Sequence, residues 1–299
     1  MGGVSSPKVA VACCRRSEDA DPSDLYPDAD AAPLQSALRH LGADSTLVSW
    51  GDPQADWSSY SHVVVSSTWD SVDRPAEFLA WVGEVSTVSE LVNPAAAIEW
   101  NLDKVYLRQL EGAGVPVIPT TWVLPPDVWQ PPDTAEFVIK PSVSAGGRNT
   151  ARYSGGDAAA LEHVRTLQRV GQTIMVQEYL ESIDSDGELN LMFFDGTFSH
   201  AVVKKPVLRT GEGVVERPWE RMAWAGLAAP SDHQLKVAEQ AMVAISDLLP
   251  QRPAYGRVDV LAGTTGDPLV LEVELIDPYL SLDLEPRAAS RLARALLHS

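Results

Sequence analysis

The first eighty residues alternate between short apolar runs and amphipathic segments, and no other feature of the sequence limits the fold as strongly. Strand-like runs occupy residues 9–13, 45–50 and 62–67, and segments with helical periodicity occupy residues 33–42 and 75–81. Strands that alternate with helices in this way form a parallel sheet with helical crossover connections. The sequence therefore predicts a small α/β domain of about 90 residues at the N-terminus.

The remainder of the chain follows a different pattern, in which hairpins and helices succeed one another. We expect a helix over residues 98–110 and a hairpin that turns at residues 195–196. The other expected elements are strands at 136–140 and 173–180, helices at 157–169 and 231–249, and a hairpin at 255–277. This order is typical of α+β architecture.

Length and charge restrict the class of protein. A chain of 299 residues is long enough for two or three domains. A net charge of -18 argues against nucleic-acid binding, which requires clusters of lysine and arginine. The sequence has no apolar stretch near 18 residues and no signal-peptide pattern, so we expect a soluble cytoplasmic protein without a membrane partner. Homo-oligomerisation stays open.

The two cysteines, Cys13 and Cys14, are adjacent, which rules out a disulfide framework. They end an apolar strand and have no evident histidine partner. A buried strand end is therefore the preferred interpretation over a catalytic nucleophile.

The last expected hairpin concentrates acidic residues on one face. A turn at residues 265–266 would place Asp259 opposite Glu272, and Arg257 opposite Glu274. Directly opposed carboxylates, ~5 Å apart, repel each other by about 3 kcal/mol at an effective dielectric constant near 20. A divalent cation such as Mg²⁺ would compensate this repulsion. The alternative is a solvent-facing hairpin whose acids pair with Arg257.

Several basic residues complete a set suited to magnesium-nucleotide chemistry. Lys140 ends a strand and is followed by the small-residue loop "SVSAGG", while Lys204 and Lys205 end a later strand. However, the P-loop pattern G-x-x-x-x-G-K-[ST] is absent, and "GEG" at residues 211–213 is only a fragment of a dinucleotide motif. If ATP binds, it binds in another way.

The order of these motifs resembles the ATP-grasp superfamily, in particular ligases of the glutathione synthetase and D-alanine:D-alanine ligase type. The resemblance extends over nearly the whole chain. It implies an α/β and α+β protein in which two α+β lobes enclose ATP behind a small parallel N-terminal domain. The implied domains are residues 1–98, the N-terminal domain; 99–182, the central lobe with a phosphate-covering loop; and 183–299, the C-terminal lobe with the metal-binding hairpin.

The resemblance also implies nucleotide-binding roles. Two lysines look like those that contact the nucleotide, and "SVSAGG" resembles the loop that covers the triphosphate with backbone N–H groups. The segment "VQEYL" looks like the adenine-binding hinge, and the glutamate of "DGE" falls where the family holds the ribose. The residues concerned are Lys104, Lys140, Ser144, Gly146, Gly147, Gln177, Glu178, Leu180 and Glu188.

Metal and catalytic roles follow from the same resemblance. Asp259 and Glu272 match the Mg²⁺ ligands, and Arg257 matches the arginine that stabilises the oxyanion. Many members carry Asn where this chain has Glu274, which would either hold a second Mg²⁺ more tightly or pair with Arg257. We expect ATP and two Mg²⁺ ions, with Mn²⁺ as a substitute, and Lys205 to contact the γ-phosphate.

Details such as "STWD" and "VKKP" are similar to small ligases that act on amino acids, and above all to O-ureido-D-serine cyclo-ligases. That similarity implies a small amino acid-like substrate, whose carboxylate ATP activates and whose own nitrogen then attacks. Thr68, Trp69 and Asp70, at the carboxyl end of an expected parallel strand, are the candidate substrate residues. Asp70 could take the ammonium group. Alternatively, Asp70 or Ser71 caps the following helix.

Three other functions remain open from the sequence. The chain could be an intermolecular amino acid or peptide ligase, a phosphotransferase that does not ligate, or a nucleotide-sensing module. Retention of Lys140, Asp259 and Glu272 together argues against the last, because a sensor does not need a complete metal site.

Overall fold

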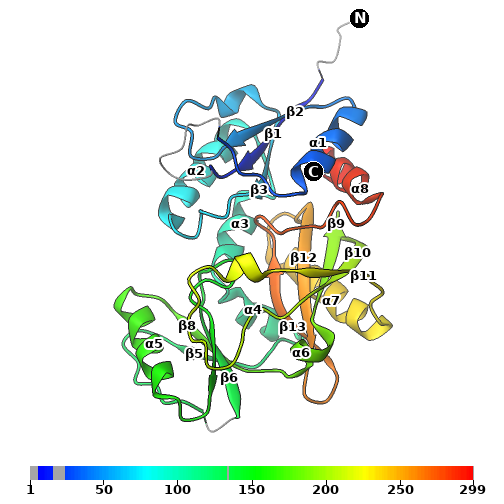
Figure 1. Ribbon diagram of the computed structural model, residues 1–299. Helices are drawn as coiled ribbons and strands as arrows, with labels where there is room; N and C mark the ends of the chain where they lie inside the picture. Colours follow the sequence, from blue (N-terminus) through cyan, green and yellow to red (C-terminus); the bar gives the residue numbers. More distant parts are fainter. Residues whose placement is uncertain (1–5, 16–23, 133–134, 299) are drawn as a thin grey trace, which may run out of the picture.

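The computed structural model describes residues 6–15, 24–132 and 135–298 (Figure 1). Its strands form three sheets: a four-stranded sheet near the N-terminus, a four-stranded central sheet and a five-stranded C-terminal sheet. None of the helices in these ranges is long and apolar enough to cross a membrane.

The N-terminal sheet is parallel, as the alternating pattern predicts. Its strand order is β2-β1-β3-β4, and helices α1 (Ala31–His40) and α2 (Pro75–Val88) connect its strands. The strands are β1 (Lys8–Cys13), β2 (Asp44–Ser49), β3 (His62–Ser67) and β4 (Glu90–Val92). The chain goes from β1 to one side and then crosses to β3 on the other side. The carboxyl ends of β1 and β3 therefore flank the crevice where open α/β sheets bind ligands.

The central sheet is antiparallel, in the order β5-β8-β6-β7, with α5 (Ala158–Arg169) packed against it. Its strands are β5 (Thr120–Val123), β6 (Glu136–Pro141), β7 (Ala151–Ser154) and β8 (Ile174–Glu178).

The single helix expected over residues 98–110 is wrong. The structure has α3 (Ala95–Leu102) and α4 (Tyr106–Gly112), separated by an irregular segment. Within it the Lys104 N–H donates to the Ser142 carbonyl instead of to a helical partner, and the Asp103 side chain accepts from the Val105 N–H. The break places Lys104 against the loop that follows β6.

The C-terminal sheet has the order β11-β10-β9-β12-β13, and all its neighbouring strands are antiparallel. The predicted turn at residues 195–196 is confirmed, because Asp195 and Gly196 both have positive φ. Its elements are α6 (Ser182–Asp186), β9 (Glu188–Phe194), β10 (Thr197–Lys204), the short helix η2 (Pro218–Arg221), β11 (Trp224–Ala228), α7 (Asp232–Leu248), β12 (Tyr255–Ala262) and β13 (Pro268–Glu274). Helix α7 packs under the sheet through one apolar face.

The chain ends in α8 (Ala288–Leu297), a helix that the sequence analysis did not include. Figure 1 shows α8 beside α1, at the N-terminal sheet rather than with the lobe that precedes it. Leu292 and Leu296 of α8 are buried in one apolar cluster with Leu34 and Leu38 of α1. The last residues thus join the N-terminal layer to the C-terminal lobe.

Candidate active site

The acidic hairpin has the register that strand periodicity predicts. In the β12–β13 pair, Asp259 lies opposite Glu272 and Arg257 lies opposite Glu274. A bulge follows Asp259, so the register changes only beyond the four residues. All four side chains therefore belong to one small area of the sheet.

Arg257 neutralises much of the charge in this area. Its guanidinium makes a bidentate contact with Asp259 (Nε–Oδ1 2.7 Å, Nη2–Oδ2 2.8 Å) and a contact of 2.6 Å with Glu274 Oε1. Burial alone would lower the pKa of Arg257, but the two carboxylates outweigh it and hold that pKa well above its usual value. Two of the acids do pair with Arg257, but the alternative of a solvent-facing hairpin is wrong in its position, because Arg257 and Asp259 are buried.

Lys104 supplies a cation to the same area from the break between α3 and α4. Its Nζ lies 3.1 Å from Glu272 Oε1 and donates to the Ser144 carbonyl at 2.5 Å. Burial would raise the pKa of Glu272, but the charges of Lys104 and Lys140 outweigh it and hold the pKa below its usual value. Glu272 is thus a carboxylate at neutral pH.

Two side chains next to Lys104 attach its helices to the β12–β13 hairpin. Asn101 donates to the Val273 carbonyl and accepts from the Leu275 N–H, while the Tyr106 hydroxyl contacts the Val273 carbonyl and N–H. These contacts satisfy buried backbone groups along the outer edge of β13. They also fix Lys104 relative to Glu272.

Lys140, on β6, is buried at 7% exposure. Among the residues that the structure describes, no carboxylate lies within 4.0 Å of its ammonium group. Burial, opposed by the charge of Glu272 and reinforced by that of Lys104, lowers the pKa of Lys140 from 10.5 to about 8. A buried ammonium without a contacting anion is suited to bind one.

Glu188 and Lys204 form a buried ion pair beside Asp259. Lys204 Nζ lies 2.8 and 3.0 Å from the two oxygens of Glu188. Burial would raise the pKa of Glu188, but Lys204 outweighs it and lowers the pKa to about 2.

Lys205 does not belong to the group of charged side chains around Glu188, Lys204 and Asp259. Its side chain is exposed and its N–H donates to the Ala223 carbonyl. Successive strand residues point to opposite faces, so only one of two adjacent lysines can reach Glu188, and that one is Lys204.

Asn190 also belongs to this group of side chains, and the sequence analysis did not identify it. It is fully buried on β9, and its Nδ2 donates to Glu188 Oε1 at 2.8 Å and to Asp259 Oδ1 at 2.7 Å. Its Oδ1 has no hydrogen-bond partner in the part of the chain that is described. The period of two from Glu188 was the available signal, because it places Asn190 on the same face.

The loop that follows β6 approaches both the N-terminal domain and η2. Gly146 and Gly147 have φ of 62° and 75°, a conformation that glycine adopts without strain. Arg148 donates to the Trp69 carbonyl at 2.7 Å, lies 3.6 Å from Asp73 and stacks 4.6 Å above the Trp219 ring. One side chain therefore connects three segments, and it too was missing from the sequence analysis.

The expected adenine hinge lies at the end of β8. Gln177 is buried and donates to the Thr120 hydroxyl, Leu180 is buried, and the Glu178 side chain is exposed. Ser144, by contrast, lies at the cluster, where its carbonyl receives Lys104. The roles of these residues in binding ATP stay predictions.

The candidate substrate residues lie at the carboxyl end of β3, as expected. Thr68 is fully buried, but Asp70 already has partners for both oxygens: Trp50 Nε1 at 2.7 Å and Arg74 Nη2 at 2.5 Å. Asp70 therefore already has a cation partner within the protein, the guanidinium of Arg74, and its role in binding an ammonium group stays a prediction. The alternative of a helix cap is wrong, because α2 begins after Arg74 rather than at Asp70 or Ser71.

Cys13 and Cys14 are buried at the end of β1. Burial raises the pKa of Cys13 to about 12 and that of Cys14 to about 11. Both are thiols at neutral pH, so the interpretation as a buried strand end is supported over a nucleophile.

Comparison with known proteins identifies the family. A family model for the N-terminal domain of D-cycloserine synthetase DcsG matches residues 9–93. The cycloserine biosynthesis protein DcsG of Streptomyces lavendulae is 38% identical over 281 residues, which is 90% of this chain and 93% of the relative. This chain belongs to the D-cycloserine synthetase DcsG family.

Solved structures agree with that assignment. The crystal structure of D-cycloserine synthetase DcsG matches with a TM-score of 0.86 at 34% identity, over 97% of this chain and 99% of the other. D-alanine–D-alanine ligase from Bacillus anthracis, complexed with ATP, matches with a TM-score of 0.63 at 11% identity, over 98% and 97% of the two chains, which shows the fold alone. The predictions of an ATP-grasp fold and of an ATP-dependent ligase are confirmed.

Proposed function

We propose that this chain closes the ring of D-cycloserine from O-ureido-D-serine, with ATP consumed and ADP, phosphate, CO₂ and ammonia released. The 38% identity to a cycloserine biosynthesis protein over nine-tenths of the chain carries the proposal. The cluster of Lys104, Lys140 and Lys204 around carboxylates supports it, because phosphoryl transfer depends on cations placed around the phosphates.

The residues present fit MgATP. Lys140 is a buried ammonium without a carboxylate within 4.0 Å among the described residues, and Asn190 Oδ1 is a buried acceptor without a partner there. Asp259, Glu272 and Glu274 are the proposed Mg²⁺ ligands. No three His, Cys, Asp or Glu side chains of the described chain already converge as a metal site. Mg²⁺ usually takes one or two carboxylates together with substrate phosphates, so this arrangement suits two Mg²⁺ ions, or Mn²⁺, that enter with ATP.

When bound, ATP supplies the phosphoryl group that turns the substrate carboxylate into an acyl phosphate, and Mg²⁺ neutralises the phosphates. Lys104, Lys140 and Lys204 would hold the triphosphate. The loop with Ser144, Gly146 and Gly147 would cover the triphosphate and exclude water. The proposed contacts to adenine and ribose are Gln177, Glu178, Leu180 and Glu188. Lys205 has no place in this scheme.

Arg257 would stabilise the oxyanion that forms when nitrogen attacks. Its Nε–H, both Nη2–H groups and one Nη1–H are engaged by Asp259, Glu274 and the Tyr279 carbonyl. One Nη1–H has no partner among the described residues. A guanidinium held from several sides is already oriented when the negative charge develops.

Ring closure forms one C–N bond while the C–O bond to phosphate breaks. One water then attacks the carbamoyl carbon, the bond from this carbon to the ring nitrogen breaks and the ring nitrogen takes a proton. The carbamic acid that leaves splits at its remaining C–N bond into CO₂ and ammonia. Because nucleophile and acyl group belong to one molecule, the site mainly has to hold that molecule in a folded conformation.

The test incubates the purified protein with ATP, Mg²⁺ and O-ureido-D-serine, and measures D-cycloserine and phosphate together. Equal amounts of the two are expected. Phosphate release only with pairs of amino acids would show an intermolecular ligase instead, and phosphate transfer without ring closure would show a phosphotransferase. ATP binding without turnover would leave the nucleotide-sensing alternative.

A further inference from the structure

Asp277 lies where the C-terminal lobe meets the N-terminal sheet. Asp277 lies three residues after Glu274, the last residue of β13, and its Oδ2 accepts a hydrogen bond from the Thr68 hydroxyl at 3.0 Å. Thr68 is fully buried directly after β3, and the charge of Asp277 also acts on Glu274. Asp277 is therefore between the proposed metal ligands and the crevice at the end of β1 and β3, the place where open parallel sheets bind ligands.

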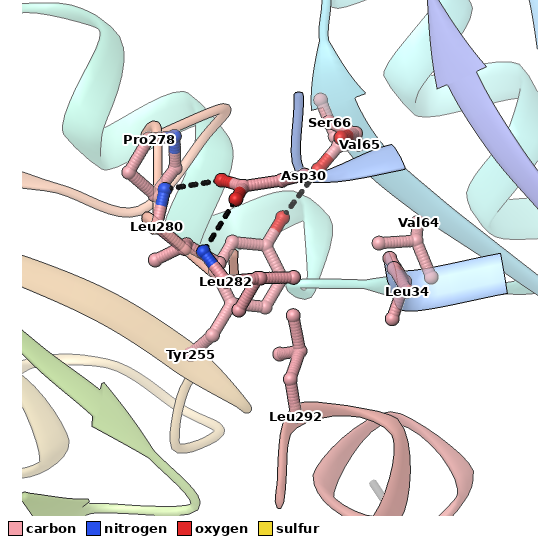
Figure 2. Close-up of a pocket in the computed structure, with 10 residues that line it drawn as sticks. All are labelled: Asp30, Leu34, Val64, Val65, Ser66, Tyr255, Pro278, Leu280, Leu282 and Leu292. Carbon is pink, nitrogen blue, oxygen red and sulfur yellow. Dashed lines mark hydrogen bonds between the residues drawn. The ribbon is translucent and has the colours of Figure 1, made fainter. Parts of the chain in front are cut away.

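The segment that carries Asp277 is held in place from both sides. The Tyr255 hydroxyl lies 2.8 Å from the carbonyl oxygens of both Val65 and Ile276, and Figure 2 shows it reaching toward β3. In the same view the Asp30 carboxylate accepts from the Leu280 and Leu282 N–H groups, at 2.5 and 2.6 Å. Asp277 is thus positioned before any substrate arrives.

The charge of Asp277 is not balanced by the protein. Across residues 6–15, 24–132 and 135–298, no lysine, arginine or histidine lies within 4.0 Å of its carboxylate. The neighbouring acids Asp70, Glu188 and Asp259 each have such a partner. Burial raises the pKa of Asp277 to about 6, with Asp28 adding to the effect and Thr68 opposing it. A partly buried carboxylate with only neutral donors is stabilised when a cation binds.

We propose that Asp277, oriented by Thr68, binds the α-ammonium group of the amino acid substrate and determines its specificity. This inference rests on the proposed function. Asp70, the residue first considered for this role, has both oxygens engaged by Arg74 and Trp50. With the ammonium group at Asp277 and the carboxylate toward the lysine cluster, the substrate is held at two points, and its ureido arm is left free to fold back.

The test compares O-ureido-D-serine with its desamino analogue, 3-(ureidooxy)propanoate, which keeps the carboxylate and the ureido nitrogen. The unaltered protein should prefer the natural substrate by about 100-fold in kcat/KM, because the analogue leaves the partly buried Asp277 carboxylate without a cation. Asp277→Asn should reduce this preference to below about 10-fold by raising the KM for O-ureido-D-serine. The KM for ATP should not change.

Asp70→Asn is the matched control, because it removes a neighbouring carboxylate that has its own partners. It should keep the preference for the natural substrate. Full preference in Asp277→Asn would overturn the inference and leave the ring-closing function standing. If the unaltered protein used both compounds equally well, the inference would also fail, a result that needs no variant to fold. A protein that closes neither compound contradicts the proposed function and the inference together.

Discussion

Replacing Lys140 by methionine should make the protein more stable and, at the same time, inactive. Lys140 is a buried ammonium whose pKa falls from 10.5 to about 8, mainly because burial disfavours the charged form. Methionine has a similar length and no charge. It removes the cost of keeping this charge in the interior, together with the cation that we propose for the triphosphate.

The size of the gain in stability and its dependence on pH follow from the pKa of Lys140 in the folded protein, about 8, and its ordinary value of 10.5 in the unfolded chain. Below pH 8 Lys140 is protonated in both the folded and the unfolded chain, so the full cost is present. Between pH 8 and 10.5 the unfolded chain binds more protons, and the unaltered protein gains stability as the pH rises. The expected difference in free energy of unfolding is about 3 kcal/mol at pH 7 and about 1.4 kcal/mol at pH 9.5.

Urea denaturation in metal-free buffer measures this difference at the two pH values. Lys236→Met is the matched control, because Lys236 is exposed on α7 and should show no comparable pH-dependent change. Turnover of ATP should fall at least about 100-fold in the Lys140 variant and stay unchanged in the control.

Two results would refute the reasoning. If Lys140→Met were less stable than the unaltered protein at pH 7, the ammonium group would be stabilising the fold. If the difference were equal at pH 7 and pH 9.5, the charge of Lys140 would not be its source.

Three further predictions concern other parts of the site. Glu272→Gln should abolish Mg²⁺-dependent turnover with an unchanged circular dichroism spectrum, and normal turnover would refute its role as a metal ligand. Arg148→Ala should loosen the loop after β6, so that more phosphate is released per ring closed. The control Arg169→Ala, on the exposed face of α5, should keep the ratio of phosphate to D-cycloserine. Equal ratios in the two variants would contradict the role of Arg148. Tyr255→Phe should lower the free energy of unfolding by about 1–3 kcal/mol in urea denaturation, because it leaves buried carbonyl oxygens unpaired, and no loss would show that water replaces the hydroxyl.

Residues whose position depends on their own strand were predictable from the sequence. The strand period of two predicted that Arg257 shares a face with Asp259, and Glu272 with Glu274. The estimated position of the turn predicted which of these residues lie opposite each other, and the structure confirms that pairing. The alternating pattern of the first eighty residues gave the parallel sheet for the same reason. In each case the local sequence contains the physical cause.

The choice between Lys204 and Lys205 shows where this reasoning stops. Adjacent strand residues point to opposite faces, so the motif "VKKP" ensures that one lysine faces the site without showing which one. The pairing of β10 with β9 has an irregularity between residues 198 and 200, and without it Lys204 would not lie opposite Glu188. Only the pairing of Lys204 with Glu188 decides it.

Asp70 and Asp277 could not be distinguished because their availability is set by other layers of the fold. Asp70 looks free in the sequence, yet Trp50 from the end of β2 and Arg74 from the start of α2 occupy it. Asp277 looks like an ordinary strand-end acid, yet its partner Thr68 is 209 residues away. Which carboxylate can receive a substrate cation therefore depends on which one the protein has left without a cation of its own, and that property exists only in the assembled structure.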